Sequence, residues 1–501
     1  MVISVAIVSL GLTAPEKVSG LTGIGSFTSW GSVLAGIIAL CAKPFAANHR
    51  PRYAAQTWRP RLARLLYTLL IYLCLPLILL RLLWRGSRAP AYRRRWGERF
   101  GFVGRLDASR QVIWLHSVSV GETIAAAPLV RRLQAQYPEA TLLVTTMTPT
   151  GSSQVGKIFG TSVEHCYAPY DMPDAIARFL SRTRPAILVI METELWPNLI
   201  HACHRRSIPV VLANARLSAK SAAGYAKVAH LARPMLSQLA VVAAQTEADG
   251  ERFLRLGVAS ESLEVTGNIK FDLQLDESLR QQAAALKAQW RGASGRPVWL
   301  VASTHRGEDE IVLDAFSQVL AHCADLLLVL VPRHPERFDE VAGLCSEAGY
   351  NLSRRSEGQG AGMAVIADGV QIVLGDTMGE LLTFCGASDI SFVGGSLVAV
   401  GGHNLIEPAA WGVPVLSGPH LFNFTEVARL LSEAGGLALC ATASELAEQV
   451  VKLLVDDAQC YRQMSDAALA VTEANRGALD RLTVLLESQI CQLSAPAASR
   501  R

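Results

Sequence analysis

The stretch Val112-Ile-Trp-Leu-His-Ser-Val-Ser-Val-Gly-Glu122 combines an apolar run, a glycine turn and the start of a helical pattern. The apolar run predicts a buried strand, and the residues after Gly121 repeat apolar side chains with helical spacing. In a parallel α/β sheet, such a turn lies at the carboxyl edge, where ligands bind. The stretch therefore predicts a strand–turn–helix unit that presents Glu122 at a helix N-terminus.

Glu122 has two roles that this pattern allows. The dipole of the helix favours an ionised carboxylate at its N-terminus, so Glu122 is available as a general base. The alternative is a purely structural role, in which the carboxylate caps the helix. The stretch by itself leaves both roles open.

Similar apolar runs recur along the chain, with helical patterns between most of them, which is typical of doubly wound parallel sheets. We expect the strands of a first domain at Val112–His116, Thr141–Thr146, Ala186–Met191, Val210–Ala213, Val241–Ala244 and Leu263–Thr266. Those of a second domain are expected at Val298–Ala302, Leu326–Val331, Gln371–Leu374, Ile390–Val393 and Val413–Leu416. Two Rossmann-like α/β domains whose carboxyl edges face a cleft would suit a reaction between two substrates.

The chain has 501 residues, too many for one ordinary core. We expect six segments: a poorly interpretable extension (1–61), a membrane anchor with a basic flank (62–104), a first domain (105–271), a linker (272–296), a second domain (297–476), and a helix with a tail (477–501). The helix of the last segment is predicted at Leu479–Gln492.

The apolar run Leu65–Leu80 lies between Arg64 and Arg81. As a helix it would be about 24 Å long, against about 30 Å for the hydrocarbon core, which fits a short span or an embedded monotopic anchor. A buried core helix is the alternative. By the positive-inside rule, the arginines that follow predict a protein in the cytoplasm, with anionic lipids as partners; they are Arg81, Arg85, Arg88, Arg93, Arg94, Arg95 and Arg99.

The uncharged stretch between Lys17 and Lys43 is rich in Gly, Ser and Thr and has no basic segment before it. It resembles neither a signal peptide nor a convincing spanning helix. A weak membrane helix around Trp30–Cys41 is one interpretation, and translated sequence upstream of the true start is another. We favour the second.

Charge and cysteine content narrow the function classes. The formal net charge of +4 does not argue for nucleic acid as a partner. The 10 cysteines form no C-x-x-C pair and no cluster with zinc spacing, which indicates reduced thiols in a cytoplasmic enzyme. The chain also lacks a P-loop and a dinucleotide-binding glycine motif, which disfavours P-loop ATP hydrolysis and nicotinamide chemistry.

Further candidate residues of the first domain follow later strands. Glu192 and Glu194 come directly after the strand that ends at Met191, so both should lie at the same sheet edge as Glu122. Paired carboxylates of this kind divide base and orienting roles, although acids at a helix start are also often only solvated. Lys270 ends the domain, where it could stabilise an anionic leaving group or serve as an ordinary linker lysine.

The second domain carries the nucleotide-site candidates. Arg333 follows a very apolar strand, and Gly379 forms a tight turn before the expected helix Leu381–Cys385, where free N–H groups could meet a phosphate or sugar. The stretch Gly394–Glu407 is dense in glycine turns, and Glu407 could accept from a ribose diol or cap a helix. His305 is a candidate phosphate contact or a structural residue.

Together these motifs resemble the 3-deoxy-D-manno-octulosonic acid (Kdo) transferases of Gram-negative lipopolysaccharide synthesis, over about residues 65–486. The motifs occur in the same order and are His116-Ser-Val-Ser-Val-Gly-Glu122, Met191-Glu-Thr-Glu-Leu-Trp-Pro-Asn198, Ala213-Asn-Ala-Arg-Leu-Ser218, Val331-Pro-Arg-His-Pro-Glu-Arg-Phe338, Gly375-Asp-Thr-Met-Gly-Glu380 and Gly394–Glu407. The extension 1–61 lies outside the resemblance, which agrees with a start further along, near Leu62.

The resemblance implies a GT-B glycosyltransferase fold and inverting transfer of Kdo from CMP-Kdo to the lipid A precursor (lipid IVA) at the cytoplasmic face of the inner membrane. It implies Glu122 as the base, Glu192 and Lys270 as transition-state stabilisers, and no metal in the nucleotide site. CMP would be bound by Pro332, Arg333, Met378, Gly379, Glu380, Asn404, Leu405, Ile406 and Glu407. The last motif reads Asn-Leu-Ile-Glu here, where Asn-Pro-Leu-Glu is common in the family.

Two rival functions remain at this stage. One is a GT-B enzyme that uses a UDP-sugar, either as a transferase or as an epimerase. The other is a non-catalytic membrane scaffold with the same fold. The donor that supports product formation separates the first rival from Kdo transfer, and the effect of Glu122→Gln separates the second.

Overall fold

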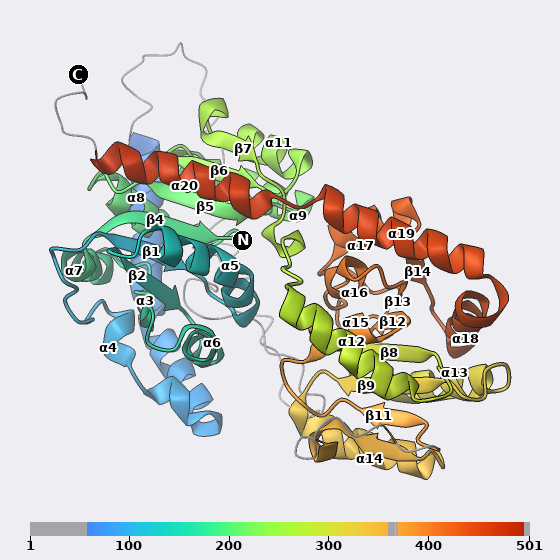
Figure 1. Cartoon of the computed structure of the whole chain (residues 1–501). Coiled ribbons are helices and arrows are strands. Elements are labelled where there is room, and N and C mark those ends of the chain that lie inside the picture. The colour runs from blue at the N-terminus through green and yellow to red at the C-terminus, as the bar shows by residue number, and fades with distance from the viewer. Residues whose placement is uncertain (1–57, 359–365, 367–368, 495–501) are drawn as a thin grey trace. The chain divides into compact units, whose positions relative to one another are not determined.

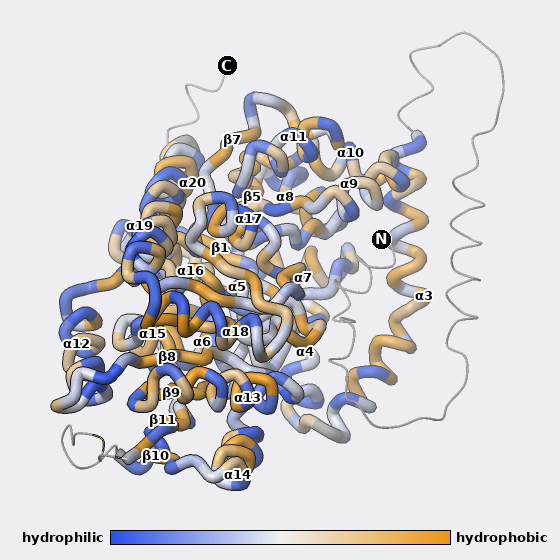
Figure 2. The backbone as a smooth tube through the Cα atoms, turned by 90° about the vertical axis from the view of Figure 1, so that its right-hand side faces the viewer, coloured by the Kyte–Doolittle hydropathy of each residue, from blue (hydrophilic) through white to orange (hydrophobic). Residues whose placement is uncertain are grey.

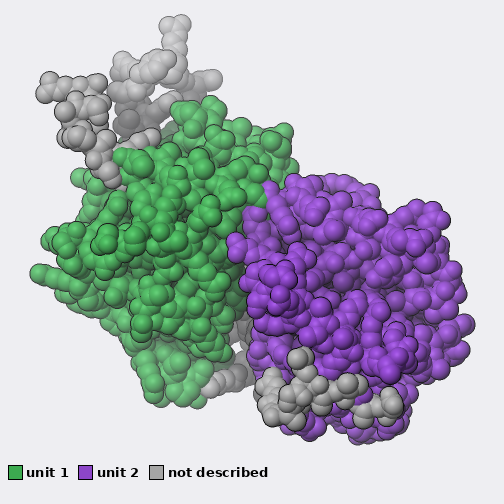
Figure 3. Space-filling model, viewed as in Figure 1, with its two compact units in different colours: residues 1–269, 477–501 green, residues 270–476 purple. Residues whose placement is uncertain are grey.

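The computed structural model describes residues 58–358, 366 and 369–494, and the interpretations of residues 1–57 lie outside this part. The chain forms two compact units (Figure 3): unit 1 contains Met1–Ile269 and Gly477–Arg501, and unit 2 contains Lys270–Arg476. The C-terminal segment therefore returns to the first unit.

Unit 1 is built on a parallel sheet of 7 strands in the order β3-β2-β1-β4-β5-β6-β7 (Figure 1). The pairing aligns His116 of β1 with Thr145 of β2 and with Ile190 of β4. Parallel sheets are covered on both faces, which explains the nearly continuous apolar runs. The strands are β1 Val112–His116, β2 Thr141–Thr146, β3 Glu164–Tyr167, β4 Pro185–Met191, β5 Val210–Ala215, β6 Val241–Ala244 and β7 Leu263–Val265.

Helices cover both faces of this sheet. Successive residues of β1 point to opposite sides, so Trp114 belongs to one core cluster and Leu115 to the other. The second cluster includes Leu482 and Leu486 of the last helix, which fixes the C-terminal segment on this unit. The helices are α4 Trp96–Arg99, α5 Val120–Gln136, α6 Pro149–Phe159, α7 Pro173–Thr183, α8 Pro197–His204, α9 Ala219–Ala226, α10 Ala229–Leu236, α11 Glu247–Leu256 and α20 Ala478–Ser494.

The apolar segment forms one long helix, α3 (Trp58–Arg88), which is hydrophobic along most of its length (Figure 2). In the described part of the chain, it is the helix that is long and apolar enough to cross a membrane. One of its faces packs into the core of unit 1, and the Tyr67 hydroxyl donates to buried Asp171 at 2.9 Å. Its other face is exposed, through Leu62, Leu65, Leu66, Leu69, Leu73, Leu77, Leu80, Leu83 and Trp84.

Unit 2 repeats the architecture with 7 parallel strands in the order β10-β11-β9-β8-β12-β13-β14. Central strand β8 is buried along its whole length, and Trp299 on it is fully buried. The strands are β8 Val298–Thr304, β9 Leu327–Pro332, β10 Leu352–Arg354, β11 Ile372–Leu374, β12 Ile390–Val393, β13 Val415–Ser417 and β14 Leu437–Leu439.

The segment 272–296, which we expected to link the domains, is an integral part of unit 2. Its helix α12 (Glu277–Arg291) buries Leu286 and Trp290, and the Trp290 ring lies 5.3 Å from that of Phe384. The other helices of unit 2 are α13 Asp309–Leu320, α14 Phe338–Glu347, α15 Leu381–Ala387, α16 Ile406–Ala410, α17 Thr425–Ala434, α18 Ala443–Val451 and α19 Ala458–Ala474.

Candidate active site

Each sheet has one position where the connections diverge to opposite sides, and ligands of open α/β sheets bind at the carboxyl end of such a position. In unit 1 this position lies between β1 and β4, which carry Glu122 and the Glu192–Glu194 segment on the loops that follow them. In unit 2 it lies between β8 and β12, followed by His305 and Gly394. Glu122, Glu192 and Glu194 thus follow the two strands at the expected position of the first sheet. In the second sheet, Arg333 follows the neighbouring strand β9 and the Met378–Glu380 turn follows β11.

Glu122 is buried in the first turn of α5, with 8% of its surface exposed. Its Oε2 accepts from the Val118 backbone N–H at 2.7 Å, and its Oε1 accepts from the Ser119 hydroxyl at 2.8 Å. The Ser119 hydroxyl oxygen in turn accepts from the Glu122 N–H at 3.2 Å. The two roles left open by the sequence are therefore compatible, because the capping contacts hold the carboxylate in one orientation.

Glu194 approaches the same position from β4. The Trp196 indole N–H donates to its Oε2 at 3.2 Å, and the Trp196 ring packs edge-on against His116 with centroids 4.8 Å apart. The His116 Nδ1 lies 2.9 Å from the Thr145 hydroxyl. His116 at the end of β1 thus packs against Trp196, and Trp196 binds the Glu194 carboxylate.

Glu192 is held differently. Its backbone lies in the left-handed region with φ of 56°, and its N–H donates to the Ala213 carbonyl at 2.9 Å. A non-glycine residue in that region is strained, and such strain concentrates at functional sites. Glu192 thus differs from Glu194 in its backbone, and both stand where the sequence predicted them.

The carboxylates influence each other's protonation. Burial raises the pKa of Glu122 above the usual carboxylate range, and the charges of Glu194 and Glu192 raise it further. Burial also raises the pKa of Glu194. Like charges held in a desolvated site resist joint ionisation, so this group can bind a proton near neutral pH.

Lys270 lies in the short 3₁₀ helix Ile269–Phe271, where unit 2 begins. The residue before it is fixed to unit 1 by Asn214, whose Oδ1 accepts from the Ile269 N–H at 3.1 Å. Asn214 itself has φ of 54° and is fully buried. The Asn214-Ala-Arg motif therefore positions the chain just ahead of Lys270, a role that the sequence did not reveal.

In unit 2, Pro332 ends β9, and Arg333 follows it with an exposed side chain. The Arg333 N–H donates to the Thr304 carbonyl at 3.0 Å, which ties this residue to the end of β8. Arg337, four residues later, is buried and paired with Asp309. The two arginines of this segment therefore differ. Arg337 is buried in an ion pair and has a structural role, whereas Arg333 is exposed at the sheet edge.

The turn Met378-Gly-Glu380 presents backbone rather than carboxylate. Gly379 has φ of 91°, which favours glycine, and Met378 is 66% exposed. The carboxylate of Glu380 accepts from the Arg355 Nη2 at 2.8 Å and from the Thr377 hydroxyl. Glu380 thus stabilises the turn, and a ligand would meet mainly the backbone and Met378.

In the segment Asn404–Glu407, some side chains are buried in the core and others are polar and only partly buried. Leu405 and Ile406 are fully buried in the core of unit 2. The Asn404 side-chain amide donates to the Glu407 Oε1 at 3.0 Å, and Asn404 Oδ1 accepts from the Ile406 N–H at 3.2 Å. Burial raises the pKa of Glu407. Only Asn404 and Glu407 can therefore offer polar side chains to a nucleotide.

Glu308 is a structural residue of this site that the sequence reasoning missed. It is fully buried, and its two oxygens accept from the N–H groups of Gly395, Ser396 and Leu397 at 2.6, 2.9 and 2.8 Å. The same carboxylate accepts from the His305 N–H at 2.9 Å. The glycine turn after β12 is therefore held by the Glu308 side chain, and these N–H groups are not free to bind a phosphate.

His305 lies beside that turn and forms a pair with His403. The two rings are stacked with centroids 5.1 Å apart, and their Nε2 atoms are 2.9 Å apart. Burial lowers the pKa of both rings, that of His403 to about 3, so the pair is neutral at neutral pH. One ring then donates to the other, which fixes their tautomers. His305 is thus held within this loop by its contact with His403.

Known proteins resemble this chain over most of its length. Residues 94–273 match the family model described as 3-Deoxy-D-manno-octulosonic-acid transferase (kdotransferase). The chain is 45% identical over 426 residues to the 3-deoxy-D-manno-octulosonic acid transferase of Haemophilus influenzae, covering 85% of this chain and 98% of that protein. With the enzyme of the same name from Bordetella pertussis, identity is 38% over 441 residues, covering 85% and 99%.

Among solved structures, UDP-GlcNAc 2-epimerase from Neisseria meningitidis aligns with a TM-score of 0.52 and 16% identity, covering 75% of this chain and 100% of that one. The C-terminal CMP-Kdo binding domain of WaaA from Acinetobacter baumannii aligns at 34% identity with a TM-score of 0.36, covering 39% and 98%. The epimerase shares the fold of two Rossmann-like domains, the GT-B type. By its sequence relationship over nearly the full length of its relatives, the chain belongs to the 3-deoxy-D-manno-octulosonic acid (Kdo) transferase family.

Proposed function

We propose that this Kdo transferase moves Kdo from CMP-Kdo to the lipid A precursor (lipid IVA) in lipopolysaccharide core biosynthesis, with inversion at the anomeric carbon. The observation that carries the mechanism is the buried Glu122 carboxylate at the divergence point of the first sheet, held by Val118 and Ser119. A raised pKa suits a base that must take a proton from a sugar hydroxyl near neutral pH.

In unit 1, Glu122 would deprotonate the acceptor hydroxyl as that oxygen attacks the anomeric carbon of Kdo. Glu192 of the same unit and Lys270, the first residue of unit 2, would stabilise the charges that develop on the sugar and on the leaving phosphate. Glu194 would keep one negative charge beside the base and thereby raise its proton affinity. Each of these roles uses only groups of the protein.

In unit 2, CMP would be held by three segments. The exposed Arg333 guanidinium suits the phosphate, and the Met378–Glu380 turn offers backbone groups. Glu407, oriented by Asn404, can accept from the ribose diol. We expect no metal in the nucleotide site, because Arg333 and Lys270 can supply the positive charge that a leaving phosphate requires.

Helix α3 supports the proposal of a membrane location. One face packs on unit 1 while the opposite face exposes leucines, which suits a helix embedded in one leaflet rather than surrounded by lipid. The arginines after it would face anionic headgroups, on the cytoplasmic side of the inner membrane. The partners would be CMP-Kdo, the lipid A precursor and anionic lipids, without nucleic acid.

The identity of the sugar nucleotide that the enzyme uses as donor tests the proposal. Purified protein in detergent is incubated with tetraacylated lipid A precursor and either CMP-Kdo or UDP-N-acetylglucosamine. Nucleotide release and the identity of the remaining sugar nucleotide are measured with and without acceptor. We expect acceptor-dependent release of CMP from CMP-Kdo and no reaction of the UDP-sugar. Acceptor-dependent UDP release would replace the proposal with a UDP-sugar transferase, and acceptor-independent conversion of the UDP-sugar would favour an epimerase.

The coupled carboxylates predict the pH dependence of transfer. Glu122 must be ionised to act as a base, so its raised pKa should make kcat fall as the pH drops through the neutral range. Glu194→Gln removes a neighbouring negative charge, which lowers the pKa of Glu122. The fall of kcat on the acidic side of the pH profile should therefore occur at lower pH in this variant. Rate profiles of both proteins, with the exposed Glu247→Gln as control, check this. If kcat of Glu194→Gln falls at the same pH as kcat of the wild type, the Glu194 charge does not raise the pKa of Glu122.

A further inference from the structure

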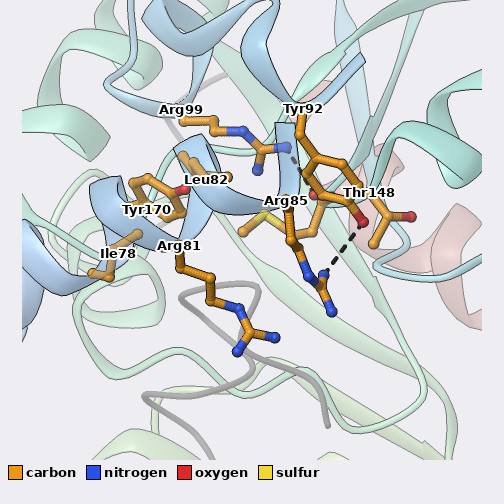
Figure 4. A pocket seen from close by; sticks show the side chains of 9 residues that line it. Ile78, Arg81, Leu82, Arg85, Tyr92, Arg99, Thr148 and Tyr170 are labelled. Carbon is orange, nitrogen blue, oxygen red and sulfur yellow. Dashed lines mark hydrogen bonds between the residues drawn. The ribbon is translucent and has the colours of Figure 1, made fainter. Parts of the chain in front are cut away.

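We propose that a pocket at the C-terminal end of α3 binds a phosphate monoester. The pocket belongs to unit 1 and collects three guanidinium groups around two tyrosines and a helix start (Figure 4). The choice of acceptor in the test below rests on the proposed function, but the pocket itself does not. Its lining residues are Ile78, Arg81, Leu82, Arg85, Tyr92, Arg99, Met147, Thr148 and Tyr170.

Arg99 is a buried arginine in the lining of this pocket. Its side chain is 2% exposed, and its Nη2 donates to the Met147 carbonyl at 3.0 Å. The guanidinium stacks over the ring of Tyr167, 4.2 Å from the centroid, but its Nε has no hydrogen-bond partner. In the part of the chain that the structure describes, Arg99 forms no ion pair with a carboxylate. A buried cation of this kind calls for an anion.

Tyr170 lines the same pocket. Tyr170 is fully buried, and its hydroxyl has no hydrogen-bond partner among the described residues. Figure 4 shows this side chain and Arg99 in the wall of one pocket. Buried hydroxyl groups are normally hydrogen-bonded, so an acceptor in the pocket would satisfy both orphaned groups at once.

Two further arginines line the mouth of the pocket. Arg81 and Arg85 stand one turn apart on α3 and are both partly buried. Arg85 donates to the Tyr92 hydroxyl at 3.3 Å, drawn as a dashed line in Figure 4, rather than to a carboxylate. Thr148 adds the N-terminus of α6, a helix of 11 residues whose dipole favours an anion. A phosphate has several acceptor oxygens and can bind more than one guanidinium group.

The location limits the source of the phosphate. The pocket lies where α3 ends, and the exposed Leu80, Leu83 and Trp84 belong to the same final turns. A helix embedded through these residues would hold the pocket at the depth of lipid headgroups. Two sources can deliver a phosphate monoester there, a phosphate group of the lipid acceptor or the headgroup of a membrane lipid such as phosphatidic acid.

The test uses the full-length protein and the variants Arg85→Gln and Arg99→Gln. Binding to phosphatidylcholine vesicles that contain phosphatidic acid or phosphatidylserine is measured first, because the two lipids differ in their phosphate monoester while both are anionic. The wild type should prefer phosphatidic acid, and each variant should lose that preference. Arg94→Gln removes the same charge outside the pocket and should keep it. Arg85→Gln keeps the test valid if Arg99→Gln fails to fold.

The second arm measures KM for a bisphosphorylated acceptor and for its monophosphorylated forms. If the acceptor supplies the phosphate, Arg85→Gln should raise KM by about tenfold for the bisphosphorylated form, with kcat unchanged, and should not affect one monophosphorylated form. If only the vesicle preference changes, a membrane lipid is the source. Failure of the proposed function would remove transfer but leave the vesicle result readable. Unchanged vesicle preference and unchanged KM in both variants would overturn the pocket as a phosphate site.

Discussion

Replacing Glu122 by glutamine is expected to lower kcat for Kdo transfer by ~10²–10⁴-fold, the usual contribution of a general base. The amide cannot take the proton of the acceptor hydroxyl, whereas the capping geometry can survive. The amide oxygen can still accept from the Val118 N–H, and the amide nitrogen can donate to Ser119. Affinity for CMP should be unchanged, since the residues proposed for CMP lie in unit 2.

The measurement pairs initial transfer rates with calorimetric titration of CMP and a thermal melt in detergent. Glu194→Gln serves as the matched control, because it neutralises a carboxylate of the same group that does not act as the base. It should remain active at alkaline pH, where Glu122 is ionised in both proteins. Wild-type rates in Glu122→Gln would leave the carboxylate as a helix cap only.

The second large effect concerns stability. Glu308→Ala removes the acceptor of four backbone N–H groups, those of His305, Gly395, Ser396 and Leu397. Each buried donor left without a partner costs about 1–3 kcal/mol, so the four together predict a loss of at least about 4 kcal/mol in the stability of unit 2. The glycine turn beside His403 would lose its shape, and CMP affinity should fall as well.

Urea unfolding of the full-length protein, followed by tryptophan fluorescence and CMP titration, checks this prediction. Glu310→Ala is the control, because that acid is exposed on the same helix start. The control should leave the transition of unit 2 and the CMP affinity unchanged. If Glu308→Ala unfolds at the same urea concentration as the wild type, water replaces the carboxylate as acceptor without a loss of stability.

The central strands could be predicted because their signals are local. Buried parallel strands such as β1, β4 and β8 are continuous apolar runs, and the turn that carries Glu122 follows directly in sequence. The edge strands β3, β10 and β14 were missed, since each has only 3 or 4 residues and all three contain exposed or partly exposed positions.

The contacts that fix the site could not be predicted, because they join residues distant in sequence. Glu308 holds Gly395 across 87 positions, and Asn214 holds Ile269 across 55. Neither residue shows a local pattern that marks the contact. The apolar run likewise predicted the length and composition of α3. It did not predict which face of the helix lies against the protein, and this is shown by the hydrogen bond from Tyr67 to Asp171.

The central claim is that Glu122 drives inverting transfer of Kdo from CMP-Kdo to a lipid hydroxyl. The most direct measurement is the mass of tetraacylated lipid A precursor after incubation with CMP-Kdo, combined with the anomeric configuration of the new linkage by NMR. We predict a mass gain of whole Kdo units with inverted configuration for the wild type, and unmodified acceptor for Glu122→Gln. Unmodified acceptor with the folded wild type, or a retained configuration, would contradict the account.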